Sequence, residues 1–371
     1  FMFRQRLVSE ECNTEVHENL KRHKVHIYNG LARFENAHII TFDDSPDGRL
    51  YGDKIIIATG SYPFQPNNIP FNSAKVHDSD SILRIERIPH SLCIVGAGVI
   101  GCEYATIFAT MGTKVHLVNS HVEILSFLDK EISNVLVKLM KNDGIETHFG
   151  ESIKSVTAPD DEQKNVCTLV ESGKKIETDM FLFAAGRSGR TKDLNCHKAR
   201  VEIGKREAII VNKTYQTSAA HIYAVGDVIG FPALASTSMD QGRVAVSHMF
   251  DTKDIDCLPK LFCYGIYTIP EVSTVGLSEA EATSQKIGYF VGRASHKKMP
   301  RGRIMGTEDG LMKILFKKSD MTVIGVHVVG PLAAELIHYG MTLVNGKKNI
   351  QEILATVFNF PTLHELYKYA A

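Results

Sequence analysis

A glycine-rich turn between an apolar strand and a helix constrains the fold of this chain most strongly. The turn reads Gly96-Ala97-Gly98-Val99-Ile100-Gly101 and directly follows the apolar segment Leu92–Val95. In such a turn the first glycine permits a tight bend, the second lets a pyrophosphate approach the backbone, and the third lets helix pack on strand. The first N–H groups of the helix then attract phosphate. We expect a dinucleotide site; the alternative is a structural turn. The expected binding residues are Gly96, Gly98, Val99, Ile100 and Gly101.

The residue that follows the next strand indicates which dinucleotide the site accepts. The strand is Val115–Val118, and Asn119 comes after it, 23 residues beyond Gly96. An acid at this position suits NAD and repels a 2′-phosphate, whereas an arginine suits NADP. Asparagine is neutral and can hydrogen-bond a hydroxyl, so we expect a pocket that accepts both coenzymes. His121 is a candidate for contact with the phosphate, although an ordinary turn histidine is the commoner role, and His116 is expected to point into the sheet.

Apolar spacing around the turn predicts a doubly wound α/β unit with a parallel sheet. The helix that opens at the turn is expected to bury five residues at helical spacing: Ile100, Tyr104, Ile107, Phe108 and Met111. A second helix follows Asp129, a candidate N-cap, and is expected to bury Ile132, Val135, Leu136, Leu139 and Met140. Beyond the polar segment 251–260 the pattern changes to an antiparallel hairpin over 311–330 and two helices, which indicates a separate α+β domain.

Composition narrows the classes of partner. A chain of 371 residues needs two or three domains. The formal net charge of zero gives no electrostatic reason to expect nucleic acid or an anionic membrane as partner, and no apolar run is long enough to span a bilayer. The seven cysteines include no CxxC pair and show no zinc-ligand spacing. We therefore expect reduced thiols, a cytoplasmic setting and no metal site.

Seven segments give the chain a specific resemblance over nearly its whole length. They are HDSDSIL, GAGVIGCEYATIF, SFLDKEIS, YQTSAAHIYAVGDVIGFPALAS, DQGR, GIYTIPEVSTVG and NFPTLHELYKYAA. On these segments the chain resembles the FAD-dependent pyridine nucleotide–disulfide oxidoreductase superfamily, and within it the soluble transhydrogenase branch. The resemblance implies the FAD/NAD-linked reductase fold, an α/β fold with doubly wound nucleotide-binding domains and a C-terminal α+β dimerisation domain. The implied domains are a partial FAD-binding domain over 1–80, an NAD(P)-binding domain over 81–200, a return to the FAD-binding domain over 201–258, and an interface domain over 259–371.

The resemblance also implies further cofactor-binding residues. Thr59 and Gly60 match the crossover where the chain leaves the FAD domain, and Gly226 with Asp227 matches a flavin motif whose aspartate accepts hydrogen bonds from the ribityl chain. Ala32 matches a contact to the adenine, and Gly186 matches the loop on the nicotinamide side. Ala235 matches a position near the flavin ring, and Glu103 matches one near flavin N5.

Two departures from the family pattern shape the expected activity. No first FAD fingerprint precedes Ile27, so we expect this chain alone to hold FAD poorly, and the lysine partner of Glu103 is missing with that fingerprint. Disulfide reductases carry a His-Pro pair near the C-terminus, whereas this chain has Phe360-Pro361, with His364 out of register. Phenylalanine cannot transfer a proton, so thiol–disulfide exchange is disfavoured.

The implied activity is hydride transfer between NADPH and NAD, mediated by FAD in a homodimer. The cofactors are then FAD, NAD and NADP, and no catalytic side chain is assigned. An alternative enzyme is a dihydrolipoamide dehydrogenase or a related disulfide reductase. A further alternative is an inactive, NAD-binding, dimeric fragment.

Overall fold

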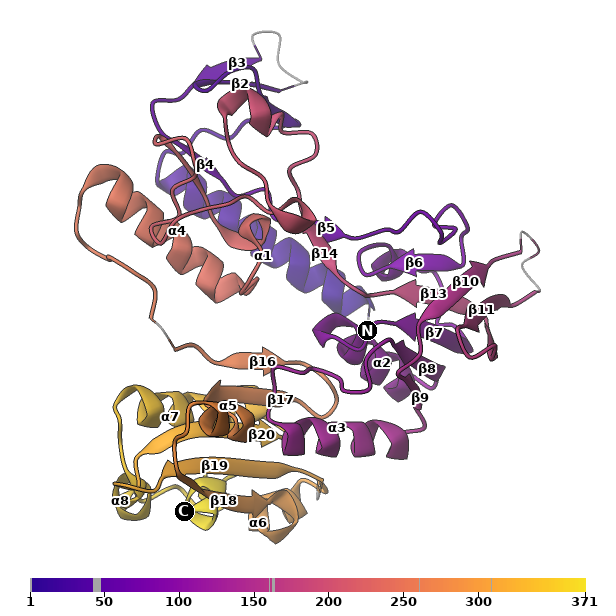
Figure 1. The fold of residues 1–371 in the computed structure, drawn as a ribbon, viewed down its shortest axis with the longest axis vertical. Coiled ribbons are helices and arrows are strands. Elements are labelled where there is room, and N and C mark those ends of the chain that lie inside the picture. The colour runs from indigo at the N-terminus through magenta and orange to yellow at the C-terminus, as the bar shows by residue number, and fades with distance from the viewer. Residues whose placement is uncertain (1, 43–47, 160, 162–163, 260, 308) are drawn as a thin grey trace. The chain divides into compact units, whose positions relative to one another are not determined.

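The computed structural model describes residues 2–42, 48–159, 161, 164–259, 261–307 and 309–371. The chain divides into two compact units, of which the first comprises residues 1–61 and 188–258 and the second residues 62–187 and 259–371. Figure 1 shows how the chain passes from one unit to the other. The crossings are at β5 (Ser61–Pro63), at β14 (Arg187–Gly189) and after Leu258. The third crossing falls within the polar segment 251–260.

The first unit begins with a polar helix, α1 (Met2–Arg22). An antiparallel sheet of order β1-β2-β3 follows, made of β1 (Ala32–Phe34), β2 (Ile39–Phe42) and β3 (Arg49–Tyr51). Two short strands pair in parallel, β4 (Ile55–Ile57) and β15 (Ile222–Ala224), and α4 (Ala235–Phe250) comes after them. The unit has its own apolar core, which includes Phe34, Ile55, Ile57, Ile222 and Val228.

A five-stranded parallel sheet forms the first half of the second unit. Its order is β6-β13-β7-β8-β9, with β6 (Val76–Asp78), β13 (Met180–Phe183), β7 (Ser91–Val95), β8 (Lys114–Asn119) and β9 (Glu146–Phe149). Two helices, α2 (Val99–Thr110) and α3 (Lys130–Asn142), cover one face of this sheet. The other face is covered by an antiparallel sheet of β10 (Ile153–Thr157), β11 (Val166–Val170) and β12 (Lys175–Thr178). The expected parallel α/β unit is thus present, with a small β-sheet covering its second face.

The two helices bury their faces differently from each other. Helix α3 starts at the expected N-cap, since Asp129 accepts a hydrogen bond from the N–H of Glu131, and it buries four of the five expected residues. In α2, by contrast, only Phe108 of the five expected residues is buried. The buried residues are Gly101, Cys102, Ala105, Thr106 and Phe108. The glycine at 101 brings α2 so close to β7 that small side chains face the sheet, a packing that apolar spacing alone does not predict.

The second half of this unit is an antiparallel sheet with helices. Its order is β16-β17-β20-β19-β18, with β16 (Tyr264–Ile266), β17 (Val272–Gly276), β18 (Tyr289–Ser295), β19 (Leu311–Lys317) and β20 (Val323–Val329). The helices are α5 (Glu279–Ser284), α6 (Pro300–Ile304), α7 (Ala333–Asn345), α8 (Ile350–Ala355) and α9 (Glu365–Ala370). The expected hairpin is confirmed as β19–β20, and α7 and α8 are the two expected helices.

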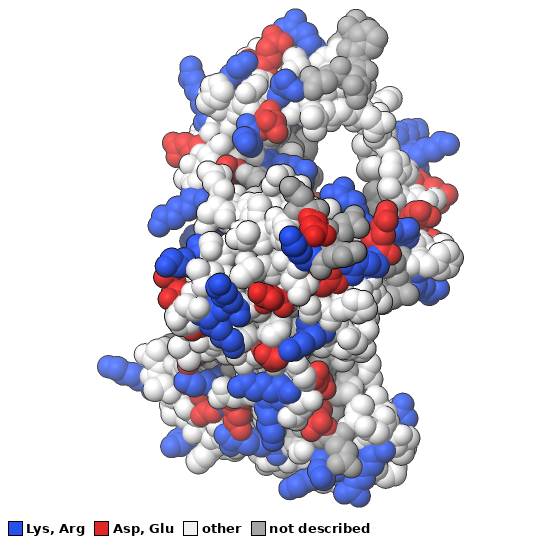
Figure 2. Space-filling model, turned by 90° about the vertical axis from the view of Figure 1, so that its right-hand side faces the viewer, with Lys and Arg blue, Asp and Glu red and all other residues white. Residues whose placement is uncertain are grey.

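The surface charge and the helices agree with the zero net charge of the sequence and with its lack of a long apolar run. On the face that Figure 2 shows, Lys and Arg side chains are intermingled with Asp and Glu. None of the helices in the described part of the chain combines the length and apolar character that crossing a bilayer requires.

Candidate functional site

The glycine-rich turn joins β7 to α2 and is closely packed on its inner side. A Cβ atom at Gly101 would lie 1.7 Å from the carbonyl oxygen of Gly96, and one at Gly96 would lie 2.8 Å from the carbonyl oxygen of Ala184. No atom of the described residues lies within 4 Å of a Cβ placed at Gly98. Two glycines are therefore required by packing within the protein. The third leaves open space on the outside of the turn, where a phosphate can approach.

Helix α2 presents its N-terminus at this open position. Its N-cap is Gly98, which has no side chain to satisfy the first N–H groups of the helix. The helix dipole adds partial positive charge there. The turn thus has the two features that bind a pyrophosphate, namely space at the backbone and unsatisfied donors.

Asn119 ends β8 and fastens the turn to the loop that follows. Its Oδ1 accepts the N–H of Ala97 at 3.1 Å. Its Nδ2 donates to the carbonyl oxygens of His121 at 2.9 Å and Glu123 at 3.3 Å. Because both amide hydrogens bind protein carbonyls, a coenzyme hydroxyl can use Asn119 only as an acceptor. A 2′-phosphate, which has acceptor oxygens, is neither bound nor strongly repelled by this side chain.

A pocket of 590 Å³ opens beside the turn. This volume is within the usual range for small-molecule sites. The lining residues come from the turn, the end of β8 and the loop before α3: Ala97, Gly98, Asn119, His121, Val122, Glu123, Leu125, Ser126 and Phe127. The pocket therefore lies where the carboxyl ends of parallel strands place a ligand in an open α/β sheet.

The lining carries little positive charge. The described residues of the lining include no lysine or arginine, and among them the exposed His121 is the one potentially cationic side chain. The carboxylate of Glu123 is paired with Lys130 at 2.7 Å, so its negative charge is partly neutralised. The pocket thus has no strong charge to select for or against a 2′-phosphate.

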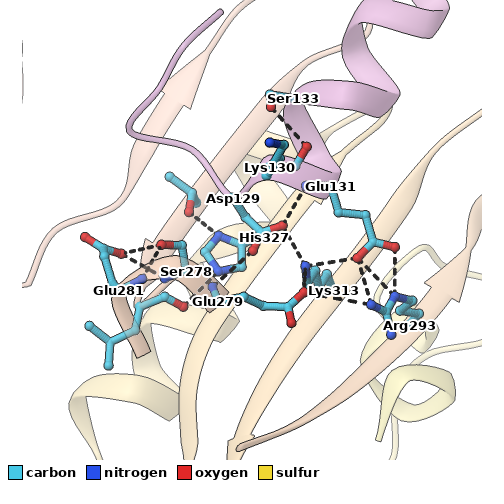
Figure 3. A network of polar contacts seen from close by, with 12 residues as sticks. Asp129, Lys130, Glu131, Ser133, Ser278, Glu279, Glu281, Arg293, Lys313 and His327 are labelled. Atoms are coloured by element: carbon cyan, nitrogen blue, oxygen red, sulfur yellow. Dashed lines mark hydrogen bonds and ion pairs between the residues drawn. The ribbon is translucent and has the colours of Figure 1, made fainter. Parts of the chain in front are cut away.

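A buried ion network holds the far end of the lining loop (Figure 3). The ammonium group of Lys313, on β19, lies 2.7 Å from Asp129 and 2.9 Å from Glu131 and also contacts Glu279. The side chains of Lys313 and Asp129 are 1% and 2% exposed, respectively. Arg293 continues the network by three hydrogen bonds to the carboxylate of Glu131. The loop between β8 and α3 is therefore fixed by Asn119 at its start and by this network at its end.

The network keeps Asp129 and Lys313 charged. Burial opposes ionisation of Asp129, but hydrogen bonds from Lys313 and from the N–H of Glu279 outweigh it and lower the pKa of this carboxyl. Burial likewise opposes the charge on Lys313, and its bonds to Asp129, Glu279 and Glu131 outweigh it and raise the pKa of the ammonium group. His327 lies in the same region, and burial lowers its pKa.

Two more expected site residues lie in the second unit. Glu103, on α2, accepts the N–H of Tyr267 at 2.8 Å, and burial raises the pKa of its carboxyl. Gly186 follows Ala184 and Ala185, the residues that pack against Gly96. The structure thus brings the loop at Gly186 to the glycine-rich turn, and Glu103 lies one turn further along α2.

The remaining expected residues lie in the first unit. The side chain of Thr59 donates to the carbonyl of Arg190 at 2.8 Å, and the N–H of Arg190 donates to the carbonyl of Gly60 at 2.9 Å. Asp227 accepts the hydroxyl of Ser61 at 3.0 Å, so the crossover after β4 and the flavin motif after β15 lie together.

The N-terminus of α4 lies close to the same motif. Gly226 donates to the side chain of Gln241 at 2.7 Å, and a Cβ at Gly226 would touch Ser238 in the first turn of the helix. Ala235 is the first residue of α4. Ala32, by contrast, begins β1 in the separate three-stranded sheet.

Sequence comparison identifies the family. Residues 4–242 match the family described as "Pyridine nucleotide-disulphide oxidoreductase". Residues 263–371 match the dimerisation domain of the same family. The chain belongs to the pyridine nucleotide-disulphide oxidoreductase family. The resemblance seen in the sequence is thereby confirmed.

Relatives within this family are similar over most of their length. The soluble pyridine nucleotide transhydrogenase of Marinomonas sp. (strain MWYL1) is 41% identical over 360 residues, which cover 95% of this chain and 76% of the relative. The transhydrogenase of Vibrio atlanticus (strain LGP32) is 42% identical, with 92% and 74% covered. That of Mycobacterium tuberculosis (strain ATCC 25177 / H37Ra) is 40% identical, with 99% and 78% covered.

Solved structures of the family share the fold. The HOCl-induced flavoprotein disulfide reductase RclA from Escherichia coli, as its Cu(II) complex, matches with a TM-score of 0.92 at 24% identity, over 100% of this chain and 84% of that one. LpdA from Mycobacterium tuberculosis matches with a TM-score of 0.90 at 22% identity, over 100% and 82%. The expected FAD/NAD-linked reductase fold is confirmed.

Sequence reasoning missed several residues that hold the expected site residues in place. Ser61 and Gln241 hold the Gly226–Asp227 motif, and Lys313 anchors Asp129. Gln241 belongs to the DQGR segment, which contributed to the family resemblance but did not indicate a role for this side chain. Lys313 carries no signal, because a lysine in an apolar strand is recognisable as a buried cation only when its carboxylate partners are in view.

Proposed function

We propose that this protein transfers hydride between NADPH and NAD as a soluble pyridine nucleotide transhydrogenase. The observation that carries the proposal is the identity of about 40% to proteins of that name over 92–99% of the chain. The pocket beside Asn119 supports it. A site that serves both coenzymes should not exclude a 2′-phosphate, and the lining residues in the described part of the chain include neither an unpaired acid nor an arginine.

The proposed coenzyme site is the turn and pocket at the end of β8. The backbone at Gly98, Val99 and Ile100 receives the pyrophosphate, while Gly96 and Gly101 keep the turn closed. Asn119 accepts a ribose hydroxyl and holds the loop. We assign Gly186 to the nicotinamide side and Glu103 to the flavin side of the same site, following their family positions.

The proposed flavin-binding residues lie in the first unit. FAD, when bound, supplies the isoalloxazine that accepts and returns the hydride. The donor set fits such a group: Asp227 offers a carboxylate to hydroxyls, α4 opens at Ala235 without a side-chain cap, and Gly226 brings the backbone against Ser238. Thr59 and Gly60 hold the crossover beside this motif, and Ala32 is assigned to the adenine end.

We further propose a cytoplasmic homodimer with the domain limits inferred from the sequence. Residues 1–80 and 201–258 then bind FAD, residues 81–200 bind NAD(P), and residues 259–371 form the interface. The match of 263–371 to a dimerisation domain supports the dimer. The seven cysteines, all unpaired, support a reducing compartment.

The C-terminal segment argues against a disulfide reductase. Phe360 occupies the place of the acid–base histidine and is 72% exposed. His364 is half-buried, and its ring stacks on Phe358, with centroids 6.3 Å apart. Neither residue supplies an exposed proton donor at the position that thiol chemistry requires.

Steady-state kinetics test the proposal. NADPH is the donor and thio-NAD the acceptor, and the absorbance of reduced thio-NAD follows the reaction. One pocket that serves both coenzymes in turn predicts parallel double-reciprocal lines, and intersecting lines would contradict it. Lipoamide is the second acceptor. Faster turnover of lipoamide than of thio-NAD would favour the disulfide reductase.

A further inference from the structure

Two adjacent parallel strands bring together a glutamate and two histidines that are not among the described residues lining the coenzyme pocket: Glu146, His116 and His148. The register pairs His116 of β8 with Glu146 of β9, and Val118 with His148. Because side chains alternate along a strand, His116, Glu146 and His148 share one face of the sheet. Strand β9 is the edge of this sheet, so the group lies at its margin.

The donor atoms are spaced like the ligands of a small metal ion. Nδ1 of His116 lies 3.3 Å from Nε2 of His148 and 3.3 Å from Oε2 of Glu146. The three donor atoms all lie within 4.8 Å of one another. Two ligands bound tetrahedrally to Zn²⁺ at about 2.05 Å are about 3.3 Å apart. The His116–His148 and His116–Glu146 distances therefore already have this length. The side chain of Glu146 is exposed and can rotate to bring its carboxylate to the same distance from His148.

We propose that His116, Glu146 and His148 form a binding site for a divalent transition-metal ion such as Zn²⁺. Two imidazoles and one carboxylate are a known set of three protein ligands for four-coordinate zinc, in which water takes the fourth position. The partial burial of the group favours binding, since His116 is 9% exposed.

Two lysines lie next to the site, and one of them has to move when a metal ion binds. Lys114 is paired with Oε1 of Glu146 at 3.1 Å, so Oε2 faces His116 and Lys114 can remain in place. The ammonium group of Lys174 lies 3.4 Å from Nδ1 of His148. When Nε2 of His148 binds a metal, Nδ1 must carry the proton, so Lys174 has to move away. Lys174 is exposed and next to the turn at Gly173, where its long side chain can do so.

The site would brace the edge strand close to the coenzyme pocket. The residues just beyond β9 hold the loop of that pocket: Gly150 donates to the carbonyl of His121 at 3.2 Å, and Glu151 donates to that of Asn119 at 3.0 Å. A metal that joins β8 to β9 therefore stabilises the strand that supports this loop.

Metal titration of the whole protein tests the site. The protein is freed of any affinity tag and metal, and Zn²⁺ is titrated in competition with a chromophoric chelator. Co²⁺ absorption reports the coordination number. We expect one ion per chain with four-coordinate Co²⁺ bands and a raised Tm. His148→Gln and Glu146→Gln should each weaken binding at least tenfold, whereas Lys174→Ala should tighten it at least threefold.

Matched controls keep the result decisive. His197→Gln removes an exposed histidine outside the site and should leave the affinity unchanged. Zinc held by the exposed Cys12 and Cys257 persists in His148→Gln and is subtracted. Because His116 is buried, the test does not depend on a variant at that position. Equal zinc affinity in the parent, His148→Gln and Glu146→Gln would overturn the proposal, as would five- or six-coordinate Co²⁺ spectra.

Discussion

The Oδ1 atom of Asn119 accepts the backbone N–H of Ala97 at 3.1 Å, which joins the end of β8 to the middle of the glycine-rich turn. The same side chain donates twice to the following loop. The residue expected to read the ribose is thus also a structural brace. Its neutrality serves both roles, because a carboxylate could not donate to the two carbonyls that Asn119 binds.

Asn119→Asp should shift the coenzyme preference. The carboxylate loses both hydrogen bonds to the loop and places a negative charge near the 2′-position. We expect the KM for NADPH to rise about tenfold more than that for NADH, which corresponds to the repulsion of two charges at a partly exposed site. Asn119→Ala is the control for the lost hydrogen bonds and should affect both coenzymes alike. Equal effects of Asn119→Asp on the two coenzymes would contradict the placement of the 2′-phosphate here.

His121→Ala should weaken NADPH more than NADH. Of the lining residues that the structure describes, this histidine is the one potentially cationic side chain. An exposed charge pair contributes up to about 1 kcal/mol, or about fivefold in affinity. Fluorescence titration of each reduced coenzyme measures the two Kd values. Equal losses would show that His121 is an ordinary turn residue.

Gly98→Ala and Gly101→Ala should separate coenzyme binding from folding. A Cβ at Gly98 meets no protein atom, so Gly98→Ala should keep the Tm while it lowers affinity for both coenzymes. A Cβ at Gly101 would lie 1.7 Å from a backbone oxygen, so Gly101→Ala should cost about 3 kcal/mol of unfolding free energy. Urea unfolding and coenzyme titration measure the pair. Full coenzyme affinity in Gly98→Ala would exclude the phosphate from that position.

Lys313→Met should destabilise the second unit. It leaves Asp129 buried without its cation, and breaking a buried ion pair costs about 3–5 kcal/mol. Lys317→Met is the matched control on the same strand, because Lys317 is exposed and should change stability by less than about 0.5 kcal/mol. The free energies come from urea unfolding. A loss below about 1 kcal/mol in Lys313→Met would show that the network contributes little.

Stability should fall in acid because of Asp129. Its pKa in the folded state is lowered from the ordinary value of 3.8, so the folded state favours the ionised form. The stabilisation is fully present above pH 3.8 and is lost as the pH falls through the lower, folded-state pKa. Lys313→Met removes the ammonium group that contributes most to the lowered pKa, so the difference in unfolding free energy between parent and variant should shrink below about pH 4. Urea unfolding at pH 6, 5, 4 and 3 measures this, and a constant difference would contradict it.

The sequence alone determined the local chemistry of the turn and of several elements. Glycines at 96, 98 and 101 after an apolar strand predict the strand, the bend and the helix, because that conformation depends on neighbouring residues. The start of α3 at Asp129 and the β19–β20 hairpin were predicted for the same reason. The apolar spacing of α2 predicted the wrong set of buried residues, because the close approach of this helix to the strand buries small side chains instead.

Tertiary structure alone decided which distant residues meet. The bonds of Asn119 to the loop, the position of Lys313 between three carboxylates, and the grouping of His116 with Glu146 and His148 all depend on strand register and on how elements pack. Register is fixed by the burial of whole faces of a sheet, which no short stretch of sequence contains. For that reason the sequence predicted a coenzyme site at the turn, and the structure supplied the residues that hold the adjoining loop.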